Sequence, residues 1–249
     1  MQMLEKEEKW KGRAELFPYG ERAIVEKIPA DTGKKTLFPM NGKAEFAEKI
    51  LPDGRRILLI KGEHFSDEAC RITKEKIEPK IKEPEKWVFL IEGKNSSSAI
   101  PEIDLLVKIA ERSGIPVEDP IISPYHMECI DEVVKKTGVK KEIVLISLTS
   151  IMMASTAKAN TTEDKVIGGL ADLWGYSKEY LRALLDNRFS ITGCRNDEEL
   201  GEMKKEIWSQ IDKTSNELSK KRLEQLLEKY KDKEYIAAYV GLNHAVIFD

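Results

Sequence analysis

The sequence predicts an α/β fold, in which helices flank a mostly parallel central sheet, with a helical insertion and a small β-rich N-terminal extension. Three apolar runs predict the core strands, and they lie at residues 57–60, 87–91 and 235–240. Continuous apolar runs of this length are typical of strands that are buried on both faces, as in a parallel sheet. Helical patterns occupy most of the chain between these runs, which favours a layered α/β arrangement.

The first part of the chain differs from the rest in its pattern of turn residues and short apolar pieces. We assign residues 1–52 to the extension and residues 53–249 to the α/β domain. Prolines and glycines punctuate the extension, and short apolar pieces at 23–25 and 36–38 are typical of strands between turns. The turn sequence Pro52-Asp53-Gly54 then introduces the first core strand.

Strand and helix alternate after this turn. Ser66 is a candidate N-cap for a helix that continues to about residue 80, and the strand at 87–91 completes a βαβ unit. Pro101 begins the next helix and Gly114 ends it. A short strand is predicted at 120–122.

A helical insertion is predicted before the closing strand. Residues 140–158 are too long a run for one strand, so we favour a buried helix there. Asn196 or Asp197 caps a helix that is expected to reach about residue 212, and a separate helix is expected at 218–231. Further helices are predicted at 127–136, 163–174 and 177–187, with a break at 191–195.

The composition excludes several classes of protein. The 41 basic and 44 acidic residues give a net charge of -3, which predicts no general attraction to nucleic acid or to an anionic membrane. The three cysteines form no Cys-x-x-Cys pair, so we expect a reducing, cytoplasmic setting. The longest apolar stretch, 143–157, is short for a bilayer span. We expect a small-molecule or peptide substrate, and the oligomeric state stays open.

Polar side chains follow each of the three core strands. Glu63 and His64 follow the first, Glu92 ends the second, and His244 follows the third in a Gly-x-x-His sequence. If the strands are parallel neighbours, these four candidate catalytic residues meet at the edge where open α/β sheets bind ligands. They could hold a divalent transition metal that activates water, with His64, Glu92 and His244 as ligands, or a histidine could act as general base without metal.

Four further residues are candidates for substrate binding. Arg195 could bind a substrate carboxylate or phosphate bidentately, and Arg188 is an alternative for that role. Asn95 lies in a polar loop after the second core strand, and His126 follows the predicted strand at 120–122. Each candidate could instead have a purely structural role. The arginines could be exposed residues at helix ends, and Glu92 could belong to a buried ion pair.

The order of these pieces resembles the superfamily of TraB, Tiki, ChaN and erythromycin-esterase-like proteins. The matching pieces are Gly62-Glu63-His64, Leu90-Ile91-Glu92, Arg195-Asn196 with the helix that follows, and Gly241-Leu242-Asn243-His244. The resemblance covers about residues 55–249 and departs in the first motif, where no residue separates Glu63 from His64. It implies an α/β fold with one site, and activities that range from metal-dependent proteolysis and ester hydrolysis by a histidine base to haem or iron binding.

These observations lead to two expected functions from different classes. The first is a hydrolase of ester or peptide bonds that uses the glutamate and histidine side chains at the strand ends. The alternative is a non-catalytic protein that binds haem, a metal or another small ligand on the same scaffold. A third reading, a partner-binding protein, would make the strand-end residues a structural ion-pair network.

Overall fold

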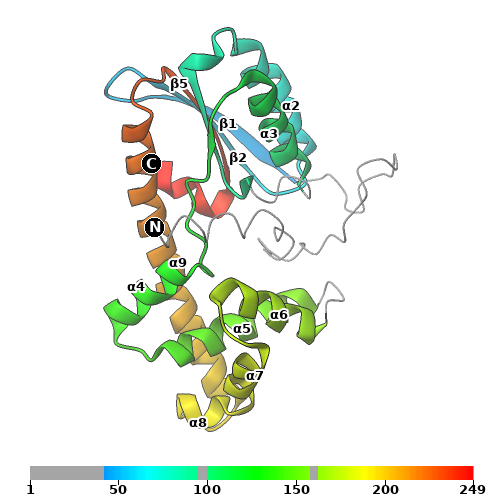
Figure 1. Ribbon diagram of the computed structural model, residues 1–249, viewed down its shortest axis with the longest axis vertical. Helices are drawn as coiled ribbons and strands as arrows, with labels where there is room; N and C mark the ends of the chain where they lie inside the picture. The colour runs from blue at the N-terminus through cyan, green and yellow to red at the C-terminus, as the bar shows by residue number, and fades with distance from the viewer. Residues whose placement is uncertain (1–41, 95–99, 158–161, 249) are drawn as a thin grey trace. The chain divides into compact units, whose positions relative to one another are not determined.

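The computed structural model describes residues 42–94, 100–157 and 162–248 (Figure 1). The short strands predicted at 23–25 and 36–38, and the candidate residue Asn95, lie outside these ranges. The chain divides into two compact units. We call the one whose described residues are 122–157 and 162–218 the helical unit, and the one with 42–94, 100–121 and 219–248 the sheet unit.

The described residues of the sheet unit contain a five-stranded sheet of order β1-β2-β5-β3-β4. The strands are β1 (Ala44–Ile50), β2 (Arg56–Gly62), β3 (Trp87–Ile91), β4 (Val117–Glu118) and β5 (Tyr235–Gly241). β5 lies between β2 and β3 and is parallel to both, and β4 is parallel to β3. Among these five strands only the edge strand β1 is antiparallel, and it lies wholly within residues 1–52, the range predicted as an extension. The prediction of a mostly parallel sheet with three neighbouring core strands is confirmed.

Both faces of this sheet are covered. On one face lie α2 (Asp67–Ile72) and α3 (Pro101–Ser113), as Figure 1 shows, and they pack on alternate strand residues such as Leu58 and Phe89. The residues between these positions, such as Leu59 and Val88, pack with the last turns of α9 (Asp197–Lys229) and with the 3₁₀ segment η6 (Leu242–Phe248). Since successive strand residues point to opposite faces, a sheet covered on both sides needs the continuous apolar runs that the sequence contains.

The helical unit is built on one hydrophobic cluster. It consists of α4 (Met127–Thr137), α5 (Lys141–Ala157), α6 (Glu163–Trp174), α7 (Lys178–Asp186), α8 (Arg188–Thr192) and the part of α9 that ends at Leu218. The helix favoured for 140–158 is confirmed as α5, and Val144, Leu145 and Leu148 are buried in the cluster. The indole Nε1 of Trp174 donates a hydrogen bond of 2.8 Å to the carbonyl of Tyr125, which ties α6 to the segment before α4.

The strand predicted at 120–122 is wrong in position. The structure places β4 at Val117–Glu118, where Val117 pairs with Phe89. Pro120 has no N–H to give to a strand ladder, and the carboxylate of Asp119 accepts the N–H of Ile121 at 2.9 Å. The segment therefore leaves the sheet before the apolar residues that suggested a strand.

The two helices predicted at 196–212 and 218–231 are a single helix, α9. The residues between them, Lys213 to Glu217, include no glycine or proline, so nothing in the backbone stops the helix. The buried hydroxyl of Ser215 donates to the carbonyl of Ile122 at 2.5 Å, so this polar stretch has partners inside the unit. Asn196 is the residue that caps the helix, because its Oδ1 accepts the N–H of Glu199 at 2.9 Å.

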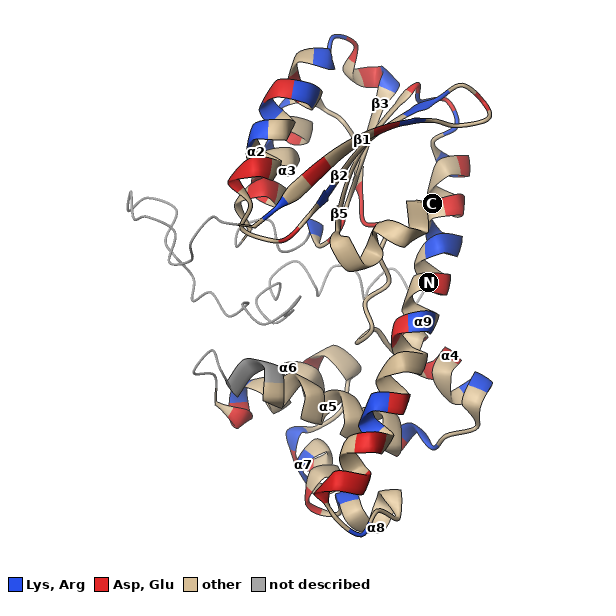
Figure 2. Ribbon diagram, turned by 180° about the vertical axis from the view of Figure 1, so that it is seen from behind, with Lys and Arg blue, Asp and Glu red and all other residues tan. Residues whose placement is uncertain are grey.

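The charged residues are mixed in sign along the surface helices. Figure 2 shows acidic and basic residues interspersed along α2 and α9. Within the described ranges, no helix is both long enough and apolar enough to cross a membrane.

Candidate functional site

Six side chains gather at the edge of the sheet where the parallel strands end. β2 and β5 end in register, with Gly62 opposite Gly241, so the segments that follow them start at the same level. β3 ends beside them at Ile91, which pairs with Tyr239. We define the edge cluster as the residues at this edge that are linked by hydrogen bonds, short distances or charge: His64, Glu92, Glu102, Asp119, Tyr239 and His244.

Glu92 and His244 form one imidazole–carboxylate pair of the cluster. Glu92 is 1% exposed and His244 is 6% exposed. Nε2 of His244 lies 3.9 Å from Oε1 of Glu92, while Oε2 of Glu92 accepts the N–H of Gly241 at 2.6 Å. A Cβ on Gly241 would lie 3.4 Å from both carboxylate oxygens, so the glycine allows the strand to approach the acid closely.

The pKa of Glu92 is far from that of an exposed glutamate. Burial raises it to about 7, and the charge of Asp119 adds to the rise, whereas the N–H of Gly241 and the charge of His64 oppose it. Asp119 is half-buried, and its desolvation raises its pKa to about 6, although its two oxygens accept the N–H groups of Gly93 and Ile121. A carboxyl group that titrates near neutrality inside a cluster is typical of acid–base sites.

His64 and Glu102 form a second pair. Nδ1 of His64 lies 3.7 Å from Oε1 of Glu102, a carboxylate in the first turn of α3 that is completely buried. The same Oε1 accepts the N–H of Phe65 at 2.9 Å and the hydroxyl of Tyr239 at 3.0 Å. The pairing of His64 with Glu102 leaves the neighbouring Glu63 exposed, with its Oε2 accepting the backbone N–H of Lys43 at 3.1 Å.

The structure brings three of the four candidate catalytic residues into the edge cluster: His64, Glu92 and His244. The candidate substrate-binding residues Arg188, Arg195 and His126 belong to the helical unit. Arg195 pairs with Glu199 four residues later, and Arg188 donates to the carbonyl of Leu185 at 3.1 Å. His126 follows no strand: its ring Nδ1 accepts the N–H of Glu128 at 3.3 Å and caps α4.

The geometry does not supply a metal centre. Within the described parts of the chain, no group of three or more His, Cys, Asp and Glu side chains is arranged to hold a metal ion. Of the two carboxylate oxygens of Glu92, Oε2 already accepts the N–H of Gly241, and only Oε1 is without a hydrogen bond from the described residues. We therefore assign no metal ligands to His64, Glu92 and His244.

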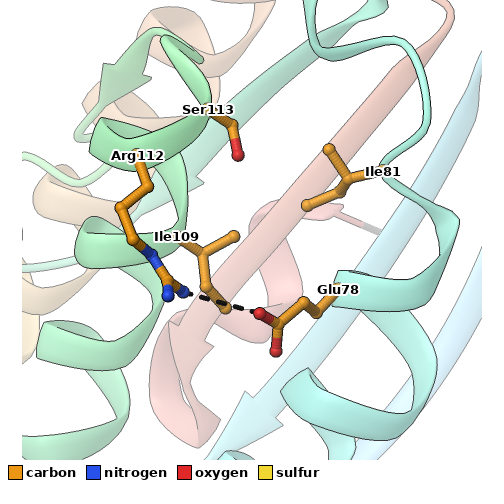
Figure 3. A pocket seen from close by; sticks show the side chains of 5 residues that line it. All are labelled: Glu78, Ile81, Ile109, Arg112 and Ser113. Carbon is orange, nitrogen blue, oxygen red and sulfur yellow. Dashed lines mark hydrogen bonds and ion pairs between the residues drawn. The ribbon is translucent and has the colours of Figure 1, made fainter.

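A separate pocket of about 310 Å³ lies at the other end of α3 (Figure 3). It is lined by Glu78, Ile81, Ile109, Arg112 and Ser113. Because α3 starts after the carboxyl end of β3 and ends before β4, its last turn lies towards the amino ends of the strands, away from the edge cluster. The charges of Arg112 and Glu78 pair with each other at 3.5 Å across the pocket. The histidines and buried acids are at the opposite edge, which makes the edge cluster the better candidate site.

Glu102, Asp119 and Tyr239 are not among the candidate residues predicted from the sequence. A signal for Glu102 was available, because it follows Pro101 in the first turn of a helix and so stands at the carboxyl edge of the sheet. Asp119 follows β4 directly, but with the strand predicted at 120–122 it would precede the strand and not stand at its carboxyl end. In the sequence, Tyr239 is indistinguishable from the apolar residues of its strand, and only the fold shows that its hydroxyl reaches Glu102.

Comparisons with protein-family models, with curated proteins and with solved structures found no match to this chain.

Proposed function

We propose that this chain is a hydrolase of ester or peptide bonds, with His244 as the proton-transfer group and Glu92 as its carboxylate partner. The observation that carries the proposal is the distance of 3.9 Å between Nε2 of His244 and Oε1 of the buried Glu92. The order of motifs that resembles the TraB, Tiki and erythromycin-esterase-like superfamily is in keeping with such a site.

The proposed step is attack of water on the carbonyl carbon of the substrate. His244 takes one proton from the water as a new carbon–oxygen bond forms, and the ionised Glu92 stabilises the resulting imidazolium. The bond to the leaving group then breaks, and the leaving group takes up a proton. The carboxyl ends of parallel strands are the usual place for such a site, because side chains from several strands converge there.

The charge of the cluster indicates which substrates it would accept. The cluster contains the buried acids Glu92 and Glu102 and the half-buried Asp119, and each would repel an anionic substrate when ionised. We therefore expect neutral or cationic esters and peptides to be better substrates than anionic ones.

The test is an ester and peptide panel assayed with wild type and with His244→Gln. The substitution should lower kcat/KM by about 10²- to 10⁴-fold, the range found when a general base is lost, while the circular dichroism spectrum and denaturation midpoint stay near wild type. Val246→Ala is the matched control, because Val246 lies in the same segment η6 and is 55% exposed. Equal activity of wild type and His244→Gln would contradict the proposal.

The same assays in the presence and absence of a chelator separate two mechanisms. Activity that survives the chelator supports the histidine base. Activity that is lost with the chelator and restored by a divalent metal would favour the metal-dependent mechanism. It would contradict the proposal that His244 acts as a base without a metal.

A second candidate function is small-ligand binding without catalysis. The buried Oε1 of Glu92 accepts no hydrogen bond from any described residue, and a buried oxygen of this kind is a natural acceptor for a ligand N–H or O–H. Native mass spectrometry of the purified chain checks this candidate. A bound molecule that is lost in Glu92→Gln, in a protein that hydrolyses no member of the panel, would favour binding over catalysis.

We further propose a cytoplasmic setting for this activity. Cys70, Cys129 and Cys194 are all free thiols, and free thiols are usual in a reducing compartment.

A further inference from the structure

The loop after β2 is held in an unusual backbone conformation around Glu102. Phe65 has φ 61°, the left-handed region that residues with a side chain seldom adopt. This conformation directs two successive N–H groups at one carboxylate, since Phe65 and Ser66 donate to Oε1 and Oε2 of Glu102 at 2.9 and 3.4 Å. Backbone conformations of this kind are costly and tend to occur at functional sites.

A third donor holds the carboxylate from the strand side. The hydroxyl of Tyr239 donates to Oε1 of Glu102 at 3.0 Å and lies 3.4 Å from the carbonyl of Glu63. Burial, together with the negative charge of Glu102, holds the pKa of Tyr239 well above its usual value of 10, so the phenol keeps its proton at any working pH. Glu102 therefore has a fixed position between α3, β5 and the loop.

His64 is placed directly against this fixed acid. Its Nδ1 is 3.7 Å from Oε1 of Glu102, and its ring centre is 6.3 Å from that of Tyr239. At 3.7 Å the two atoms are within ion-pair range but farther apart than in a hydrogen bond. A carboxylate this close to one ring nitrogen favours the form of the histidine that carries a proton there, and leaves the other nitrogen as the one that exchanges protons.

We propose that Glu102 is the positioning residue of His64, that Tyr239 fixes Glu102, and that His64 is the second proton-transfer group of the site. This inference rests on the proposed hydrolase for its chemical role. His244 takes a proton from the attacking water, and His64, as the imidazolium, gives its proton to the leaving-group oxygen or nitrogen as that bond breaks. His64 then regains a proton from solvent and His244 releases one, so the charges balance over a turnover.

The kinetic test uses esters that share one acyl group and differ in the basicity of the leaving group. A lost acid matters most for a poor leaving group such as an alkoxide, and least for nitrophenolate, which needs no proton. For alkyl esters, His64→Gln should lower kcat by about 10²- to 10⁴-fold, the range for loss of a general acid, and Glu102→Gln by about 10- to 100-fold, the size typical for the partner of a histidine, each with a smaller change in KM. For nitrophenyl esters the loss should be at least severalfold smaller. Equal losses for both ester types would overturn the proposed acid.

Two variants show whether the effect depends on the position of Glu102. Glu102→Gln retains an oxygen that can accept from Phe65 and Tyr239, so the loop should keep its structure. Tyr239→Phe removes the hydroxyl that donates to Glu102, together with its longer contact with the carbonyl of Glu63, and should show a weaker form of the same leaving-group dependence. Asp104→Asn is the control, because Asp104 is in the same turn of α3 but pairs with Lys108 at 2.7 Å on the surface.

A second readout does not require activity. The chain has only three histidines, so nitrogen-15 spectra of labelled histidine can be assigned from single substitutions. His126, whose Nδ1 accepts a backbone N–H, provides an internal reference for the Nε2–H tautomer. We expect His64 to be the Nδ1–H tautomer when neutral, and to lose that preference in Glu102→Gln while His126 is unchanged.

The two experiments distinguish the two proposals. A His64 tautomer that does not depend on Glu102 overturns the positioning role, whatever the activity. If the tautomer does depend on Glu102 but the chain hydrolyses no ester or peptide of the panel, the positioning role of Glu102 is supported. The proposed hydrolase function and the acid role of His64 are then both contradicted.

Discussion

Glu92 is expected to serve activity at the expense of stability. Its carboxyl group has a pKa of about 7 in the folded chain against 4.5 for the ordinary group, so the folded state holds this proton more tightly than the unfolded state does. Between these two pH values the unfolded chain has released a proton that the folded chain retains. The free energy of unfolding therefore falls as pH rises from about 4.5 to about 7, by roughly 3 kcal/mol for this one group.

Glu92→Gln should remove this penalty. The amide oxygen can still accept the N–H of Gly241, and no charge has to be buried. We expect the variant to exceed wild type in free energy of unfolding by about 1–3 kcal/mol near pH 8 and to differ little near pH 5, as measured by urea denaturation at both pH values. Glu111→Gln, at an exposed position of α3, should show no such dependence. A Glu92→Gln variant that is less stable near pH 8 would mean that the ionised pair with His244 is structural.

Among the secondary-structure elements, the segments that follow β2 and β5 determine the geometry of the edge cluster. Gly42, before β1, crosses the loop after β2: its N–H donates to the carbonyl of Phe65 at 3.2 Å, and its own carbonyl accepts the hydroxyl of Ser66 at 2.7 Å. A Cβ at Gly42 would stand 2.7 Å from the carbonyl oxygen of His64, so a side chain there must move the loop.

Gly42→Ala should therefore destabilise the chain by about 1–3 kcal/mol, the usual cost of a forced backbone shift. It should also change the nitrogen-15 signals of the His64 ring. Gly201→Ala is the matched control, because Gly201 lies in α9 with open space at its Cβ position. That variant should be more stable than wild type by about 0.4–1 kcal/mol, since alanine loses less backbone entropy in a helix. Equal effects of the two substitutions in thermal denaturation would contradict the close packing of Gly42 on the loop.

The elements also show which parts of the fold could be read from the sequence. The three core strands, α5 and the caps at Ser66 and Asn196 follow from local patterns, because apolar runs and capping side chains act over a few residues. The convergence of His64, Glu92 and His244 followed from one further rule, that parallel strands end at one edge. Glu102 and Tyr239 could not be predicted in the same way, because their link joins residues 137 apart in the chain. The continuity of α9 was missed because polar residues in the middle of a helix resemble a loop.

The molecule as a whole contains separate hydrophobic cores. One cluster lies entirely in the helical unit, and two lie on the two faces of the sheet in the sheet unit. α9 contributes Ile211 to the first and Leu223 to the sheet unit, so its backbone is shared while its buried side chains are not. Units with cores of their own can unfold at different denaturant concentrations.

Two cysteines report on these units separately. Cys129 is buried in the helical unit, which raises the pKa of its thiol to about 12. Cys70 lies on α2 of the sheet unit, where burial, with the charge of Glu102, raises the pKa of its thiol to about 11. Both thiols should resist alkylation in the folded chain near pH 8, because the thiolate is the reactive form. Each should become reactive when its own unit unfolds.

Pulsed alkylation over a urea series, read by mass spectrometry of the peptides, should therefore give different midpoints for Cys129 and Cys70. A ligand or substrate analogue that binds the edge cluster should shift the Cys70 midpoint more than the Cys129 midpoint, because binding stabilises the folded unit that holds the site. Coincident midpoints that shift together would show instead that the continuous backbone of α9 makes the two units unfold as one, and the helical unit would then contribute to the stability of the site.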